Sequence, residues 1–171
     1  MTLQFMNVKT MQNVKAILAV DSTNGLAKNG KIPWKSKTDM SFFKNATLQN
    51  TVVMGSNTLL SLPNEHPLPD RNNIVITSQK QKYNEIYKAF NNLVFLDLDE
   101  TIEFMKNNET TTFFIIGGNQ IYDLLLPYCS TIFLTKIKKS YDCDLIFKHN
   151  FLLSNKELLY EDDELEIYKF V

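Results

Sequence analysis

Apolar runs alternate along this chain with segments of helical periodicity, and the alternation predicts its elements. Continuous apolar runs, typical of strands that are buried on both faces, occupy residues 14–20, 51–55, 73–77, 93–96 and 113–116. Helices are predicted between and after them, at residues 36–48, 56–62, 83–90, 98–106 and 119–126. We therefore expect an α/β domain with a largely parallel sheet.

The end of the chain has a different pattern. Residues 131–137, 158–161 and 165–171 are predicted strands with no helix between them, and the acidic turn 161–164 joins the last two. Strands joined by short turns pair antiparallel. The sheet is therefore expected to close with antiparallel strands.

The length of 171 residues fits one domain that can bury a core without metals or disulfides. We interpret residues 14–171 as this domain and residues 1–13 as an N-terminal extension that need not be ordered. The first thirteen residues lack the features of a signal peptide, and no stretch approaches about 18 apolar residues, so no membrane partner is expected.

Charge and composition narrow the partners. The chain has 18 basic and 19 acidic residues, a net charge of −1, and no basic cluster, so a nucleic-acid partner is not expected. Its two cysteines and two histidines are isolated, which argues against a disulfide scaffold and against a metal site. A small-molecule partner and a reducing, cytoplasmic setting are the expectation.

One acid needs an explanation. In the stretch 29–43, Asp39 shares a helix face with Met40, Phe43 and Thr47, and an unpartnered buried carboxylate costs several kcal/mol. Two interpretations remain open on this stretch alone. Asp39 could complete a capping box with Ser36, worth roughly 1 kcal/mol, or it could be a site residue that meets a ligand.

Two glycine-bearing strand ends are candidates for ligand binding. Gly55 is followed by a helix that begins at Ser56, where free backbone N–H groups and the positive end of the helix attract a phosphate. Gly117-Gly118 leads from another strand into the helix at Asn119 and lets a ligand approach the backbone closely. The first pattern also occurs in many α/β proteins without nucleotides, and the second is equally compatible with a plain tight turn and is not the G-x-G-x-x-G fingerprint.

Taken in order, the motifs resemble dihydrofolate reductase over residues 14–171. The matching pieces are Ile17-Leu18-Ala19-Val20, Asn24-Gly25-Leu26-Ala27-Lys28-Asn29-Gly30-Lys31-Ile32-Pro33-Trp34, Asp39 with Phe43, Val53-Met54-Gly55 with Thr58, Pro67-Leu68-Pro69-Asp70-Arg71, Ile115-Ile116-Gly117-Gly118 with Tyr122, and Leu134-Thr135-Lys136-Ile137. The resemblance implies a single-domain fold with a central eight-stranded, mostly parallel mixed sheet, an antiparallel C-terminal strand and flanking helices.

The resemblance also implies an activity, the NADPH-dependent reduction of 7,8-dihydrofolate to tetrahydrofolate, which serves thymidylate and one-carbon metabolism and is an antifolate target. Asp39 would hold the pterin, Thr135 would support Asp39, Trp34 would anchor a lid and orient a water near Asp39, and Ile32 would close that lid over the nicotinamide. These four residues are the implied catalytic set. We expect a monomer.

Two further sets are implied. The substrate-binding residues would be Ile17, Leu18, Ala19, Met40, Phe43, Leu62, Arg71, Ile116 and Tyr122, with Arg71 holding the α-carboxylate of the glutamate tail, and with Leu18 and Met40 also packed in the core. The cofactor-binding residues would be Ala19, Asn24, Leu26, Gly55, Ser56, Asn57, Thr58, Thr77, Ser78, Gln79, Gly117, Gly118, Asn119, Gln120 and Ile121, with a cis peptide between Gly117 and Gly118.

One departure bears on the cofactor. Ser56 stands where the family usually has Arg or Lys against the 2′-phosphate, and Asn57 is also uncharged, which predicts a smaller margin of NADPH over NADH. Two alternatives stay open: a related reductase that acts on a ribosylated pyrimidine of riboflavin synthesis, and a non-catalytic folate- or nucleotide-binding protein. The first would have no use for Arg71 or for the pair of Asp39 and Phe43, and the intact set of Trp34, Asp39, Arg71 and Thr135 speaks against the second.

Overall fold

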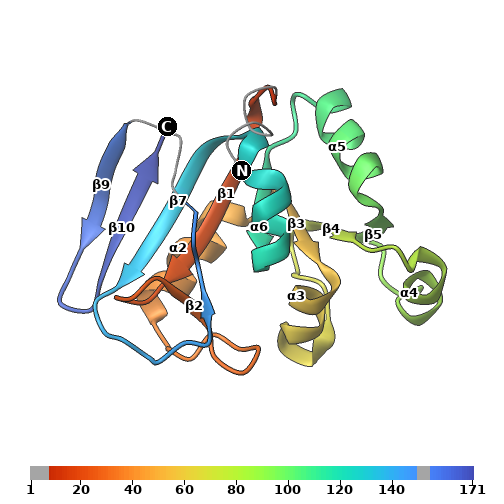
Figure 1. Cartoon of the computed structure of the whole chain (residues 1–171). Coiled ribbons are helices and arrows are strands. Elements are labelled where there is room, and N and C mark those ends of the chain that lie inside the picture. Colours follow the sequence, from red (N-terminus) through yellow and green to blue (C-terminus); the bar gives the residue numbers. More distant parts are fainter. Residues whose placement is uncertain (1–7, 150–154) are drawn as a thin grey trace.

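The structure, a computed structural model, describes residues 8–149 and 155–171 and is built around one sheet (Figure 1). Its strand order is β5-β4-β3-β6-β1-β7-β10-β9. The strands are β1 (Met11–Val20), β3 (Thr51–Gly55), β4 (Asn72–Ile76), β5 (Leu93–Leu96), β6 (Phe113–Gly117), β7 (Cys129–Ile137), β9 (Lys156–Glu161) and β10 (Leu165–Phe170). A separate two-stranded sheet pairs β2 (Gly25–Ala27) with β8 (Leu145–Ile146).

The pairing follows the expectation from the sequence. Every neighbouring pair from β5 across to β7 is parallel. Strand β10 then pairs antiparallel with β7 and with β9. The predicted mostly parallel eight-stranded sheet with an antiparallel C-terminal end is confirmed.

Helices cover both faces of the sheet. They are α2 (Lys37–Thr47), α3 (Ser56–Ser61), α4 (Lys80–Ile86), α5 (Leu98–Asn107) and α6 (Asn119–Leu125), with short 3₁₀ turns at η1 (Pro63–Glu65) and η2 (Leu126–Tyr128). Apolar side chains of α5 and α6 pack in one core cluster, and those of α2, α3 and α4 pack in a second cluster on the other face (Figure 1). Such two-sided cover explains the continuous apolar runs of the central strands.

Element boundaries differ from the prediction at a few places. Strand β1 begins at Met11, three residues inside the segment interpreted as an extension, and α4 runs from Lys80 to Ile86 rather than over residues 83–90. Residues 1–7 of the expected extension lie outside the described residues. None of the helices in the described ranges has the length and apolarity needed to cross a membrane.

Strand register gathers the functional segments at one edge of the sheet. Ala19 on β1 lies opposite Thr135 on β7, and Met54 on β3 lies opposite Gly117 on β6. All four residues are at or near the carboxyl ends of parallel strands, where open α/β sheets bind ligands. The order along the sheet places β6 between β3 and β1, so the two glycine-bearing strand ends are neighbours.

Candidate active site

Helix α2 brings Asp39 to this edge. The Ser36 hydroxyl caps the helix by accepting a hydrogen bond from the Asp39 N–H at 3.1 Å. The Asp39 carboxylate itself interacts with the side chains of Thr135 and Trp34. Cap and site therefore coexist, since Ser36 caps through its own hydroxyl and leaves the acid group of Asp39 free for other partners.

The surroundings of Asp39 favour its protonated form. Burial raises the pKa of Asp39, and the side chains of Thr135 and Trp34 only partly oppose this rise. The Trp34 Nε1 atom is buried and completes no hydrogen bond among the described residues, so Thr135 is the closer partner of the two. Thr135 is almost fully buried and lies on β7 beside β1.

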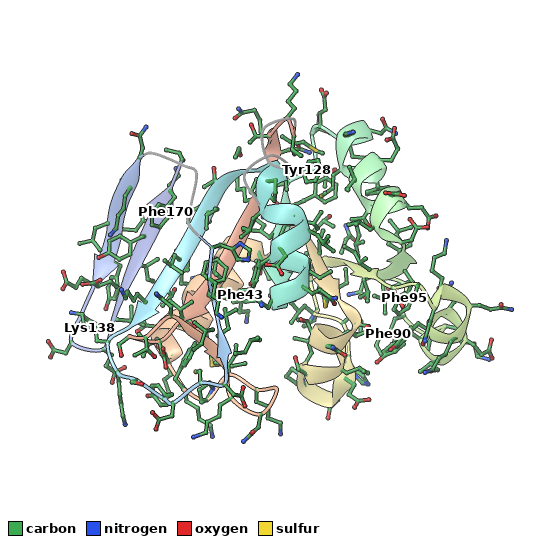
Figure 2. The ribbon with its side chains drawn as sticks, in the orientation of Figure 1. Phe43, Phe90, Phe95, Tyr128, Lys138 and Phe170 are labelled. Atoms are coloured by element: carbon green, nitrogen blue, oxygen red, sulfur yellow. The ribbon has the colours of Figure 1, made fainter. Side chains whose placement is uncertain are left out.

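Apolar side chains line the face of the sheet that α2 covers. Ile17 is buried and Ala19, Phe43, Leu62 and Ile116 are partly buried in the clusters on this face. Figure 2 places Phe43 near the middle of the molecule, and Phe90 and Phe95 toward α4. The face of the sheet beneath the helix that carries Asp39 is therefore largely apolar.

Of the two residues expected to pack in the core as well, one does and one does not. Met40 is 67% exposed, so the expectation that it packs in the core is wrong. Core packing is confirmed for Leu18, but in the cluster on the opposite face of the sheet, because neighbouring residues of a strand point to opposite sides. Its side chain therefore does not join Ile17 and Ala19.

Tyr122 reaches the site from the other face of the sheet. Its hydroxyl donates a hydrogen bond to the Ile17 carbonyl at 2.9 Å, and burial raises its pKa far above the ordinary value. A hydroxyl so held stays protonated. Tyr122 thus fixes the backbone of β1 next to Asp39 rather than contributing a charge.

Arg71 lies at the far end of α2 from Asp39. Its Nε donates to the Pro69 carbonyl at 2.8 Å, and its Nη1 donates to the Thr47 hydroxyl at 3.1 Å. The residue is only 8% exposed, and no carboxylate forms an ion pair with it in the described part of the chain. Burial lowers the pKa of Arg71, against a rise caused by Asp70. A buried guanidinium with donors to spare is suited to an anionic ligand.

The loop between residues 24 and 34, here called the lid loop, leads from the turn after β1 to Trp34. Its strand β2 pairs with β8, and the Asn29 N–H donates to the Asp144 carboxylate at 2.9 Å. At its end Trp34 is buried and packs on Tyr141 with ring centroids 5.8 Å apart. Ile32, at the loop's outer part, is 62% exposed. The loop is therefore anchored at its ends while Ile32 stays accessible.

Asp21, which sequence reasoning missed, anchors the start of this loop. The fully buried carboxylate accepts hydrogen bonds from the N–H groups of Thr23, Gly25 and Tyr141 at 2.8 to 2.9 Å, and from the Thr23 hydroxyl at 2.9 Å. Burial raises the pKa of Asp21, but these hydrogen bonds outweigh that effect and bring it down to about 2. The acidic residue directly after the first apolar strand was the available signal.

Asp21 should make the stability of the protein depend on pH. Because its pKa is lower in the folded state than the ordinary value of 3.8, it stabilises the fold above about pH 4, by roughly 1 to 2 kcal/mol. That contribution should be lost as the pH falls toward 2. Asp21→Asn should destabilise the fold at neutral pH, since its amide would face the Tyr141 N–H, and its difference from the unmodified protein should shrink in acid. Urea unfolding from pH 7 to pH 2 measures this, with the exposed Asp163→Asn as control; a constant difference would contradict it.

The glycine-bearing strand ends form the other half of the site. Gly117 and Gly118 are joined by a cis peptide bond, and Gly117 has φ +119°, a conformation that side chains disfavour. A Cβ on Gly118 would lie 3.6 Å from the Thr58 hydroxyl, and one on Gly55 would lie 3.1 Å from Ile121. The starts of α3 and α6 thus approach each other closely at glycines, where no side chain separates them. The Asn119 Oδ1 atom is buried there without a hydrogen-bond partner among the described residues.

The remaining residues expected to bind the cofactor differ in how far they are buried. Thr77 is buried and its hydroxyl accepts a hydrogen bond from the Gln79 N–H at 3.0 Å. Leu26 is partly buried against the core and Ser56 is half-buried, while the following residues are exposed: Asn24, Asn57, Ser78, Gln79 and Gln120. Across the described ranges, no three His, Cys, Asp or Glu side chains lie close enough together to hold a metal ion.

Two depressions lie elsewhere on the surface. One, of about 260 Å³, is at the amino ends of β3, β4 and β5, and another, of about 390 Å³, is beside the loop 63–69. Neither is lined by Asp39 or by the paired glycines. The Asp39 site is identified by its chemistry and by its place on the sheet rather than by enclosure.

Fold and site together define an α/β protein with a half-buried acid on the apolar face of α2 and an adjoining pair of glycine-bearing strand ends at one sheet edge. The sequence model of the family described as dihydrofolate reductase matches residues 13–169. The chain belongs to the dihydrofolate reductase family, a family of oxidoreductases.

Individual relatives agree with this assignment. The dihydrofolate reductase of Heliothis virescens is 33% identical, with 88% of this chain and 89% of that protein covered. The enzyme of Ureaplasma parvum is 32% identical, with 85% and 90% covered. A solved structure of dihydrofolate reductase from Enterococcus faecalis, complexed with NADP(H) and RAB-propyl, has a TM-score of 0.75 at 24% identity and covers 94% of this chain and 96% of its own. At that identity the structural likeness shows the fold alone.

Proposed function

We propose that this chain catalyses the NADPH-dependent reduction of 7,8-dihydrofolate to 5,6,7,8-tetrahydrofolate. The observation that carries the proposal is Asp39, a half-buried acid that interacts with Thr135 and forms no ion pair with a cation in the described part of the chain. A ligand edge that carries N–H donors supplies the partner that the protein does not. The 2-amino and N3 edge of a pterin is such an edge.

Asp39 orients the pterin and favours its protonation. Two hydrogen bonds from the pterin edge to the carboxylate would contribute roughly 1.5 to 3 kcal/mol each. Thr135 holds the carboxylate in place, and burial raises the pKa of Asp39. The carboxylate that accepts both bonds has no proton to give, so the proton that N5 takes up comes from water.

The rest of the cleft aligns the reactants. The chemistry supplied by bound NADPH is transfer of a hydride from its nicotinamide ring to pterin C6. Ala19, Ile116 and the paired glycines lie between the two halves of the site, where the rings must stack. Ile32 on the lid loop is exposed and positioned to shed water from the reacting rings on closure. The protein's task is to align the two rings and to exclude bulk water from them.

The residues at the two glycine-bearing strand ends, Gly55 and Gly117-Gly118, fit NADPH. Gly55 and Gly118 are the N-caps of α3 and α6, and neither helix start has a side-chain cap. Their backbone N–H groups can meet a pyrophosphate. The Thr58 hydroxyl, close to the Cβ position of Gly118, adds another donor.

A spectrophotometric assay of NADPH oxidation in the presence of dihydrofolate tests the proposal. Consumption of NADPH that depends on both the enzyme and dihydrofolate supports it. No turnover at high enzyme concentration would overturn the enzymatic function and favour a non-catalytic binding protein. Turnover of a ribosylated pyrimidine in place of dihydrofolate would favour the riboflavin-pathway alternative.

The uncharged side chains at 56 and 57 predict a weak preference for NADPH over NADH. Ser56→Arg should raise the ratio of kcat/KM for NADPH to that for NADH by about 10-fold to 100-fold, because a guanidinium can bind the 2′-phosphate. Steady-state kinetics with both cofactors measures the ratio. Thr110→Arg adds the same charge at an exposed position on the α5–β6 connection and serves as control. An unchanged ratio in Ser56→Arg would contradict the assignment of Ser56.

A further inference from the structure

Asn73, the second residue of β4, is a nearly fully buried amide that bonds to the loop presenting Arg71. It is 1% exposed. Its Oδ1 accepts a hydrogen bond from the Leu68 N–H at 2.9 Å, and its Nδ2 donates to the carbonyls of Leu68 and Arg71 at 3.0 and 3.1 Å. One side chain therefore holds the loop 68–71 at both ends.

Asn92, the residue directly before β5, makes a second set of hydrogen bonds to the same loop. Its Nδ2 donates to the same two carbonyls, those of Leu68 at 3.1 Å and Arg71 at 3.2 Å. Asn73 in turn donates to the Asn92 carbonyl, from its backbone N–H at 2.8 Å and from Nδ2 at 3.3 Å. The two asparagines are thus fixed to each other as well as to the loop.

The loop lacks the means to hold this shape by itself. Pro67 and Pro69 have no N–H to donate. The one N–H between them, that of Leu68, donates its hydrogen bond to Asn73 Oδ1. Asp70 has φ +59°, a left-handed conformation that is unfavourable for a residue other than glycine. External hydrogen bonds must therefore maintain the loop.

The shape of the loop sets the direction of the guanidinium. Arg71 Nε donates to the Pro69 carbonyl, which lies between the two clamped carbonyls, and Nη1 donates to Thr47. These two bonds leave three of the five guanidinium N–H groups for a ligand. If the Pro69 carbonyl moves, the guanidinium bonded to it turns as well, and its three free N–H groups then point in a different direction.

We infer that Asn73 is a positioning residue that aims Arg71 at the carboxylate of the substrate's tail and thereby sets the affinity for tail-bearing substrates. The inference rests on the proposed function. Asn73 acts through the loop backbone and touches no reacting atom. A purely structural role would affect all substrates alike, whereas the positioning role affects only those whose carboxylate reaches Arg71.

The test compares dihydrofolate with a 7,8-dihydropterin that lacks the aminobenzoyl-glutamate tail. In Asn73→Ala the KM for dihydrofolate should rise about tenfold, equivalent to about 1.4 kcal/mol, with kcat changed less than threefold. The kcat/KM for the tail-less substrate should stay within about twofold of the unmodified value, since Arg71 has nothing to bind there. An equal fall for both substrates would overturn the inference and leave the proposed function intact.

Asn13→Ala is the matched control. Asn13 also donates through Nδ2 to three backbone carbonyls, those of Met105, Asn108 and Thr111, but on the far side of the sheet from Arg71. It should lose comparable stability without a rise in the KM for dihydrofolate. A rise as large as that of Asn73→Ala would show that lost stability alone causes the effect and would overturn the inference.

A double-mutant cycle isolates the route through Arg71. In an Arg71→Ala background, Asn73→Ala should raise the KM for dihydrofolate no further, and a second tenfold rise would overturn the inference. If Asn73→Ala does not fold, the half-buried Asn92→Ala provides the same test, with an expected rise of about threefold. Failure of the unmodified protein to turn over either substrate would reject the proposed function and this inference together.

Discussion

Asp39→Asn is expected to lower kcat/KM for dihydrofolate at neutral pH by about 100-fold to 10,000-fold, because the two charge-assisted hydrogen bonds to the pterin edge would be lost. The amide keeps the size of the side chain but has only one acceptor oxygen, so it cannot accept both bonds of the pterin edge. The contacts with Thr135 and Trp34 are also arranged for a carboxylate. Steady-state NADPH oxidation with saturating cofactor measures the effect.

The same substitution should stabilise the unliganded fold. Burial raises the pKa of Asp39, so the ionised side chain is less favourable in the folded state than in the unfolded chain at neutral pH. The asparagine side chain of the variant carries no charge to bury. The gain in unfolding free energy should vanish below about pH 4, where the acid is protonated in both states. Denaturant titrations at several pH values measure it.

Asp99→Asn is the control for both effects, because Asp99 is an exposed acid in the first turn of α5. Its activity and its stability should stay near those of the unmodified protein. Unchanged turnover in Asp39→Asn would reject the role of Asp39. A loss of activity accompanied by a loss of stability would show that Asp39 is a structural residue rather than an acid kept at a cost for catalysis.

The sheet could be predicted because its signal is local. Buried parallel strands such as residues 51–55 and 113–116 are continuous apolar runs, and a helix follows each of several strands. The boundaries of the helices and strands were harder to predict. Strand β1 continues back to Met11 because Met11 pairs with Cys129 on β7, a contact between distant segments that no pattern within residues 11–13 announces.

The site could be predicted in part. Asp39, Arg71, Thr135 and the paired glycines carry chemistry that stands out or motifs that match a family. The structure brings the elements of Asp39, Thr135 and the glycines to one sheet edge, whereas Arg71 precedes the amino end of β4. The exposure of Met40 could not be predicted, because the helical period gives the face of α2 but not how far the cleft opens beside it.

The roles of Asp21 and Asn73 in holding loops were missed for a different reason. Asp21 and Asn73 act through hydrogen bonds from side chains to backbone groups of remote loops. Such bonds impose no periodicity, and an aspartate or asparagine beside a strand end reads from sequence as an ordinary turn residue. Only the folded arrangement shows that these polar groups are buried and saturated with partners.

Arg71→Ala is expected to raise the KM for dihydrofolate by about 30-fold to 1,000-fold, the equivalent of roughly 2 to 4 kcal/mol for truncating one side of a buried charged pair. The value of kcat should fall far less, because the tail lies away from the reacting ring and its contact is the same in the ground state and the transition state. Arg71→Lys should recover only part of the affinity, since an ammonium keeps the charge without the two-pronged geometry.

Substrates separate this effect from a general loss of structure. The tail-less dihydropterin should be turned over equally well by Arg71→Ala and by the unmodified protein, because it presents no carboxylate. Thr47→Val, which removes the hydroxyl that accepts from Arg71 Nη1, should raise the KM for dihydrofolate by a smaller factor of about 3 to 10. The guanidinium would still be held by the Pro69 carbonyl. An equal loss with both substrates would mean that Arg71 stabilises the end of α2, and the carboxylate would then need a different partner.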